Sequence, residues 1–215
     1  GLPRVALIAY DPSVEIEERF NALSLALASA VIKATTAKQI TSQVIEQYIT
    51  KMRVLSECPS IMELQHIFND ADVLVLSPGP SLRNDFELIK TSAAKFITIA
   101  PVKSLEALFN EGIKPDFSIW MDPRDHSYAI PDMEAVRDIP IILGECCHTS
   151  FFEAPFKRQF IYPDPATLLA PTNNVLHGDD PILCAGSNVS VLATVIAIGL
   201  GAKSVTLMLK AAIPS

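Results

Sequence analysis

Short runs of apolar, often β-branched residues alternate along this chain with longer stretches whose apolar residues recur at helical spacing. Residues 73–76, for example, form a continuous apolar run that is followed by a turn and by the helical pattern of residues 82–91. A strand that is apolar at every position is buried on both faces, and helices of βαβ units usually supply that burial. The pattern therefore predicts an α/β fold, a doubly wound, Rossmann-like and mostly parallel sheet with helices on both faces.

The same pattern places the other elements. Strands are expected over residues 5–9, 73–76, 95–100, 117–121, 140–143 and 204–209, and helices over residues 13–30, 36–55, 82–91, 104–111 and 188–200. Within residues 36–55, the apolar residues Tyr48, Ile49 and Met52 fall on one predicted helix face. Residues 145–180 have weaker periodicity and more Pro and aromatic residues, so we expect a lid, an excursion or short irregular elements there.

Two domain regions are expected. Residues 71–215 form the Rossmann-like domain. Residues 1–70 supply either an N-terminal strand and a helical cap or the end of a preceding domain.

Composition excludes several classes of function. The 215 residues carry a net charge of −7 without a marked Lys and Arg run, which argues against a nucleic acid partner. Every apolar run is broken well short of the roughly 18 residues needed to span a bilayer, so no membrane span is expected. No secretory signal is visible, and the four cysteines form no C-x-x-C pair. We therefore expect a cytoplasmic protein with reduced cysteines.

Two turns rich in small residues open predicted helices. In the first, Gly79 allows the backbone to approach a ligand, and the helix start that follows can face an anion. Ordinary capping by Ser81 in the first turn, and by Ser187 or Asn188 in the second, explains the same residues equally well. The candidate anion-binding residues are Ser77, Gly79, Pro80, Ser81, Gly186, Ser187 and Asn188.

Acidic and imidazole side chains follow predicted strands. Asp122 lies at the carboxyl end of its strand, where it could contact a ribose hydroxyl, orient a His or hold a metal, whereas Asp116 at the opposite end is expected to bind backbone amides. His126, His148 and His177 lie in loops and can act as general bases. The candidate catalytic residues are His148, His126 and Asp122.

Three blocks of sequence together resemble the domain shared by Maf (motility accessory factor) flagellin glycosyltransferases and MptE-like pterin diphosphokinases. They are residues 74–82, residues 108–117 with Asp122 following, and residues 186–203. The first and last blocks also resemble bacterial sialyltransferases, in which the corresponding segments hold a CMP-sugar.

The resemblance implies a Maf-type glycosyltransferase that moves a nonulosonic acid, of the sialic, pseudaminic or legionaminic kind, from its CMP-sugar to flagellin or a surface glycan. His148 or His126 would then be the base, and no cofactor would be required. The MptE-like branch implies instead an ATP- and magnesium-dependent diphosphokinase acting on 6-hydroxymethylpterin, with Asp122 and either Asp116 or Asp125 as metal ligands.

A non-catalytic nucleotide-sugar-binding module is a third interpretation, because the chain departs from the family pattern. Ser77 and Pro78 stand where these families commonly carry Gly followed by Asn, Ala or Gly. Residues 210–215 stand where the families usually carry Gly-x-Asp.

Overall fold

The computed structural model describes residues 45, 46, 48–162 and 188–208. The chain divides into two compact units, residues 1–45 and 46–215, and the fold described below is that of the second. The elements expected over residues 5–9 and 13–30 lie outside the described residues. In chain order the described part comprises helical residues 48–57, η1 (Ile61–Leu64), α2 (Gln65–Phe68), β1 (Asp72–Leu76), η2 (Pro80–Asp85), α3 (Phe86–Ser92), η3 (Ala93–Lys95), β2 (Ile97–Pro101), α4 (Val102–Asn110), β3 (Phe117–Trp120), η4 (Ser127–Ala129), η5 (Ala135–Asp138), β4 (Ile141–Gly144), α5 (Thr149–Glu153), β5 (Gln159–Tyr162), α7 (Val189–Gly199) and β6 (Ser204–Met208).

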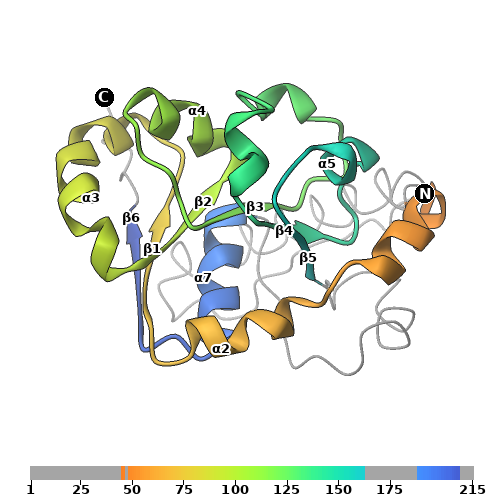
Figure 1. Ribbon diagram of the computed structural model, residues 1–215, viewed down its shortest axis with the longest axis horizontal. Helices are drawn as coiled ribbons and strands as arrows, with labels where there is room; N and C mark the ends of the chain where they lie inside the picture. Colours follow the sequence, from red (N-terminus) through yellow and green to blue (C-terminus); the bar gives the residue numbers. More distant parts are fainter. Residues whose placement is uncertain (1–44, 47, 163–187, 209–215) are drawn as a thin grey trace, which may run out of the picture. The chain divides into compact units, whose positions relative to one another are not determined.

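Six parallel strands form one sheet in the order β5-β4-β3-β2-β1-β6 (Figure 1). The first five strands follow one another across the sheet, and β6 then returns to the free side of β1, with Val73 opposite Val205. The strand order therefore reverses between β1 and β6, and in open α/β sheets such a reversal is where ligands bind. The predicted doubly wound, Rossmann-like fold is confirmed.

Alternate residues of each strand face two separate cores. Leu74 and Leu76 of β1 belong to one core with apolar residues of α3, α4 and α5. Val73 and Val75 belong to the other, with residues of α2 and α7. Because a fully buried Val or Leu side chain contributes about 1.5–3 kcal/mol, both faces of the sheet stabilise the fold, and the strands are apolar at nearly every position.

Polar side chains within the sheet are hydrogen-bonded to neighbouring strands. Ser118 Oγ of β3 donates to the backbone oxygen of Ala100, 3.1 Å away. Asp116, directly before β3, accepts hydrogen bonds at Oδ2 from both Thr98 N (2.8 Å) and Thr98 Oγ1 (2.7 Å). The expectation that Asp116 binds backbone at the amino end of its strand is confirmed.

Two regular elements lie in the segment expected to be irregular. Helix α5 and strand β5 both fall within residues 145–180, and β5 extends the sheet by pairing along β4. Both have only four or five residues, which is too short for a hydrophobic period to become visible in the sequence. Residues 163–180 lie outside the described part of the chain.

The helix of residues 48–57 buries a different face from the predicted one. Tyr48, Lys51 and Leu55 are buried, whereas Ile49 is 64% exposed and Met52 is also exposed. The spacing of the three buried residues is i, i+3 and i+7, which places them on one face. A lysine therefore lies in the middle of the inward face, at a position where an apolar residue would be expected.

Residues before β1 contribute to the sheet cores. Phe68 of α2 is fully buried, and Ser60 forms a parallel bridge with Ile161 of β5. The predicted boundary at residue 70 stays a prediction, because residues 1–44 lie outside the described part of the chain.

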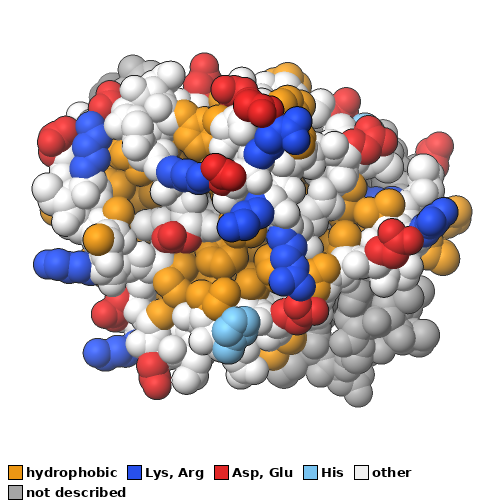
Figure 2. All heavy atoms as spheres, in the orientation of Figure 1, with side chains coloured by type: hydrophobic (Ala, Val, Ile, Leu, Met, Phe, Trp, Pro, Cys, Tyr) orange, Lys and Arg blue, Asp and Glu red, His pale blue; other side chains and the backbone are white. Residues whose placement is uncertain are grey.

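Surface charge is mixed on the face shown in Figure 2, where Lys and Arg side chains are interspersed with Asp and Glu. Among the described residues, no helix has both the length and the apolar character that a bilayer crossing requires.

Candidate functional site

The described candidate catalytic and anion-binding residues lie at the carboxyl edge of the sheet. Gly79 follows β1, Asp122 follows β3, and His148 follows β4. Helix α7 packs on β1, β2 and β3 and leads back to the start of β6, so Asn188 at its N-terminus reaches the same edge (Figure 1). Gly186 and Ser187 lie outside the described residues.

The turn after β1 contains a buried hydroxyl and an open glycine. Ser77 is only 5% exposed, and its Oγ makes no hydrogen bond to the described part of the protein. Gly79 has extended backbone, and a Cβ at this position would meet no atom of the described residues within 4 Å. Neither backbone strain nor packing against the described residues therefore requires a glycine at this position. The backbone of η2, which begins at Pro80 and continues through Ser81, follows it directly.

Asn188 caps helix α7. Its Oδ1 accepts hydrogen bonds from Ser190 N (2.8 Å) and Val191 N (3.4 Å). These bonds satisfy N–H groups that have no partner within the helix. The capping interpretation of Asn188 is confirmed, and a part in ligand binding stays a prediction.

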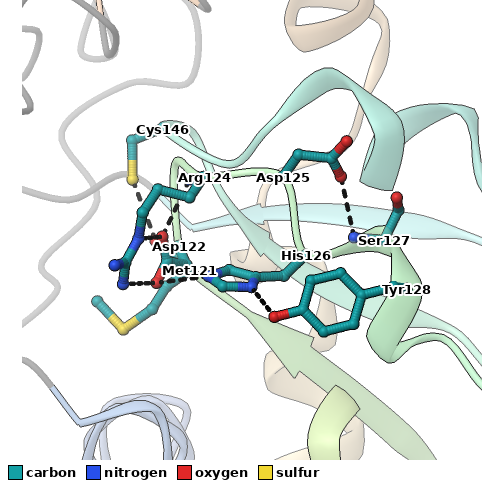
Figure 3. Close-up of polar contacts among 8 residues, drawn as sticks. All are labelled: Met121, Asp122, Arg124, Asp125, His126, Ser127, Tyr128 and Cys146. Carbon is teal, nitrogen blue, oxygen red and sulfur yellow. Dashed lines mark hydrogen bonds and ion pairs between the residues drawn. The ribbon is translucent and has the colours of Figure 1, made fainter.

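Asp122 is held by the loop that follows it. Arg124 donates to its carboxylate through Nε (2.9 Å), Nη2 (2.7 Å) and the backbone N (2.9 Å), and His126 Nε2 lies 3.6 Å from Oδ2 (Figure 3). Burial by itself raises the pKa of Asp122, but the hydrogen bonds and charge of Arg124 outweigh it and lower the pKa below its usual value. Asp122 is therefore an ionised carboxylate near neutral pH.

His126 faces protein groups with both ring nitrogens. Nδ1 lies 2.7 Å from the hydroxyl of Tyr128, and Nε2 is buried beside Asp122 (Figure 3). The ring also packs edge-on against Trp120, with ring centroids 5.7 Å apart. These contacts orient the imidazole.

His148 lies beside a serine and an aspartate. Its Nδ1 lies 2.9 Å from Ser150 Oγ and 3.3 Å from Ser150 N, and it caps α5. Ser150 Oγ in turn donates to Asp125 Oδ1 at 3.1 Å, and this oxygen is 3.8 Å from His148 Nδ1. Nε2 of His148 makes no hydrogen bond to a described residue.

Asp125 connects the loop after β3 with the start of α5. Besides Ser150, its Oδ1 accepts a hydrogen bond from Ser127 N at 3.0 Å, which is the main reason that the pKa of Asp125 is lowered. The structure thus brings Asp122 and His126 together in one loop and joins that loop to His148 through Asp125. His177 lies outside the described residues.

Two buried charged residues at this edge were missed from the sequence. Lys51 is 2% exposed, and Glu145, directly after β4, is fully buried. Burial lowers the pKa of Lys51, and the carboxylate of Glu145 opposes that shift. Lysine and glutamate are usually exposed, so only the spacing of Lys51 with buried Tyr48 and Leu55 could have indicated its position.

One of the aspartates proposed for magnesium lies apart from the other two. Asp116 lies at the amino end of β3 and Asp122 beyond its carboxyl end. Within the described ranges, no group of three or more His, Cys, Asp or Glu side chains is arranged to hold a metal ion. Asp116 is therefore not placed to share a metal ion with Asp122, whereas the pair of Asp122 and Asp125 stays a prediction.

Comparisons with known proteins agree with the fold. The family model described as 6-hydroxymethylpterin diphosphokinase MptE-like matches residues 46–208. A similar fold is found in the solved structure of a Maf glycosyltransferase from Magnetospirillum magneticum AMB-1, with a TM-score of 0.52 and 21% sequence identity to this chain. The matched region covers 65% of this chain and 22% of the chain in that structure. At that identity the likeness shows the fold, and this chain spans about a fifth of that protein. The search of curated proteins gave no match.

Proposed function

Because the chain belongs to the MptE-like family, matched over residues 46–208, and shares its fold with a Maf glycosyltransferase, we propose that it is a Maf-type glycosyltransferase. Its donor is a CMP-activated nonulosonic acid, and its acceptor is a hydroxyl of flagellin or of a surface glycan.

The arrangement of two helix starts carries this proposal. The turn of Ser77–Leu82 leads into helices that cover one face of the sheet, and Asn188 begins α7 on the other face. Both reach the carboxyl edge beside β1, where the strand order reverses. This is the place at which open α/β sheets bind nucleotides, so the CMP moiety is proposed to bind between these two segments.

His148 is the better placed of the two candidate bases. In the tautomer that a base requires, the proton is on Nδ1 and is donated to Ser150 Oγ, 2.9 Å away, whose own hydrogen is directed to Asp125; the 3.3 Å capping bond from Ser150 N to Nδ1 is then given up. Nε2 then carries a lone pair and has no described partner, whereas His126 Nε2 is buried beside Asp122. In the proposed reaction the acceptor oxygen bonds to the sugar's anomeric carbon, CMP departs with the electron pair of the broken bond, and Nε2 takes the hydroxyl proton.

Ligand-dependent thermal stability tests the proposal. The wild-type chain is melted with CMP, CDP, ATP and a pterin, each with and without magnesium. A ligand present at 100 times its Kd stabilises the folded state by about 2.7 kcal/mol, a readily measured shift. We expect CMP to raise the Tm without magnesium. A shift with ATP that requires magnesium, and none with CMP, would contradict the proposal.

A Gly79→Val variant sharpens the test. A Cβ at Gly79 would meet no described atom within 4 Å, so we expect folding to be retained, while the methyl groups of valine would fill space beside the proposed phosphate site. We expect CMP affinity to fall at least about tenfold, equivalent to 1.4 kcal/mol, in a calorimetric titration.

Gly199→Val is the matched control for this variant. A Cβ at Gly199 also meets no atom within 4 Å, and this residue lies at the far end of α7. Equal CMP affinities in wild type and Gly79→Val would remove the proposed pocket.

Diphosphoryl transfer from ATP to a pterin is the second candidate, because the matched family is described by that activity. The same melting series separates the candidates through its magnesium-dependent ATP arm. CMP binding without any transfer would favour the third interpretation, a nucleotide-sugar-binding module.

A further inference from the structure

Lys51 is a charged residue inside the core that the proposed reaction does not use. It lies on the inward face of the helix of residues 48–57, between Tyr48 and Leu55. Burial penalises its ammonium group, and the nearby carboxylate of Glu145 favours it. A buried lysine is retained in a core only where its ammonium group has partners.

The partners of Lys51 lie on both sides of His148 in the sequence. The ammonium group donates a hydrogen bond to the backbone oxygen of Cys147, the residue directly before His148. It also lies 4.9 Å from the ring centroid of Phe152, on the helix that His148 caps. One side chain therefore contacts both the turn that leads into His148 and the helix that follows it.

The same turn is attached to the end of β3. Cys147 Sγ donates to the backbone oxygen of Trp120, and Cys146 Sγ donates to that of Met121, each at 3.3 Å (Cys146 and Met121 in Figure 3). Met121 directly precedes Asp122. Lys51 thus contacts a turn whose thiols connect it to the loop of Asp122 and Asp125.

From these contacts we infer that Lys51 is a positioning residue, which holds the turn before His148 so that Nδ1 stays against Ser150 and Nε2 remains available to the acceptor hydroxyl. This role rests on the proposed function of His148 as the base. Lys51 does not contact the reacting atoms, since it is buried beneath the turn.

Two substitutions at one position test this inference. Lys51→Met keeps the unbranched stem against Phe152 but removes the charge and the donor, whereas Lys51→Gln keeps a shorter donor for the Cys147 oxygen. Arg53→Met is the matched control, because Arg53 lies on the same helix with its side chain 89% exposed. Each is compared with wild type in the complete chain.

The decisive readout is nitrogen NMR of histidine-labelled protein, with the His148 signals assigned from their absence in His148→Asn. In wild type and Arg53→Met we expect distinct shifts for the two ring nitrogens, as a single fixed tautomer gives. In Lys51→Met we expect both shifts to move toward the averaged values of an imidazole that exchanges tautomers, and in Lys51→Gln a smaller movement. Unchanged His148 shifts in Lys51→Met would overturn the inference.

Kinetics and binding supply the second readout. In Lys51→Met we expect kcat for sugar transfer to fall about 10- to 100-fold, as for other small misplacements of a catalytic group, with CMP affinity within about twofold of wild type. If wild type transfers no sugar but the NMR effect appears, the proposed function fails while the positioning role stands. Failure of both Lys51 variants to fold would assign Lys51 to domain stability and overturn the narrower role.

Discussion

An aspartate lies beyond each end of strand β3, and the two carboxylates have different hydrogen-bond partners. Asp116 at the amino edge is bound by the backbone and hydroxyl of Thr98 in the neighbouring strand. Asp122 at the carboxyl edge is bound by the side chain of Arg124 and lies beside His126. The first set of bonds joins two strands of the sheet, whereas the second joins charged and titratable groups of one loop.

The carboxyl edge also contains buried polar atoms that make no hydrogen bond to the described part of the protein. Ser77 Oγ, Trp120 Nε1 and His126 Nε2 are buried there without a hydrogen bond to the described residues. Each such group costs about 1–3 kcal/mol of stability when no partner is supplied. The polar groups beside the amino end of β3 are therefore paired within the sheet, whereas several at its carboxyl end are buried without a described partner, as the proposed ligand site requires.

The largest expected effect is on catalysis at the carboxyl edge. His148→Asn retains an N-cap for α5, because asparagine also caps well, but has no titratable ring nitrogen. We expect kcat for transfer from a CMP-sugar to fall about 10²- to 10⁴-fold. The Tm and the affinity for CMP serve as controls and should stay close to wild type. An unchanged kcat would exclude His148 as the base and direct the same test to His126.

The next effect is on stability at the amino edge. Asp116→Ala leaves the N–H and hydroxyl of buried Thr98 without their acceptor. We expect the free energy of unfolding in urea to fall by about 1.5–3 kcal/mol, with CMP affinity unchanged. Asp116→Asn, which keeps an acceptor oxygen, should lose less. A loss of CMP binding in a folded Asp116→Ala protein would contradict the proposal that the amino edge serves stability and the carboxyl edge binds CMP.

The smallest effect is the pH dependence of stability at Asp122. Its folded-state pKa is below the unfolded value, so its contribution is complete above an unfolded pKa of about 3.9 and is lost as the pH falls through the folded value. Because Arg124 is largely exposed, we expect Asp122→Asn to cost less than about 1 kcal/mol at pH 7. Melting curves from pH 7 to 2 should show wild type and variant converging, and a gap that widens toward low pH would contradict this sign.

Much of the fold could be predicted because its core strands are apolar on both faces. The runs around Val75, Ile99 and Ile119 identify central strands, and the following helical patterns identify α3, α4 and α7, although α3 is preceded by the 3-10 turn η2. Strand β5 was missed because an edge strand of four residues shows no period.

The site could be predicted only in part. The positions of Asp122 and His148 at the carboxyl edge could be predicted because a residue directly after a strand lies at that edge of a parallel sheet, and their roles stay predictions. The Asp125–Ser150–His148 contacts and the burial of Lys51 depend on tertiary packing between segments up to 96 residues apart, and no local pattern records them. Ser187 and Gly186 stay predictions.

The position of Lys51 ahead of the first strand has a practical consequence for dissecting the protein. A fragment that begins at Asp72 would still encode all six strands, yet it would remove Tyr48, Leu55 and Phe68 from the two cores. It would also remove Lys51, whose ammonium group donates a hydrogen bond to the backbone oxygen of Cys147, directly before His148. Any minimal expression fragment intended to retain the chemistry of this edge must therefore start upstream of Tyr48.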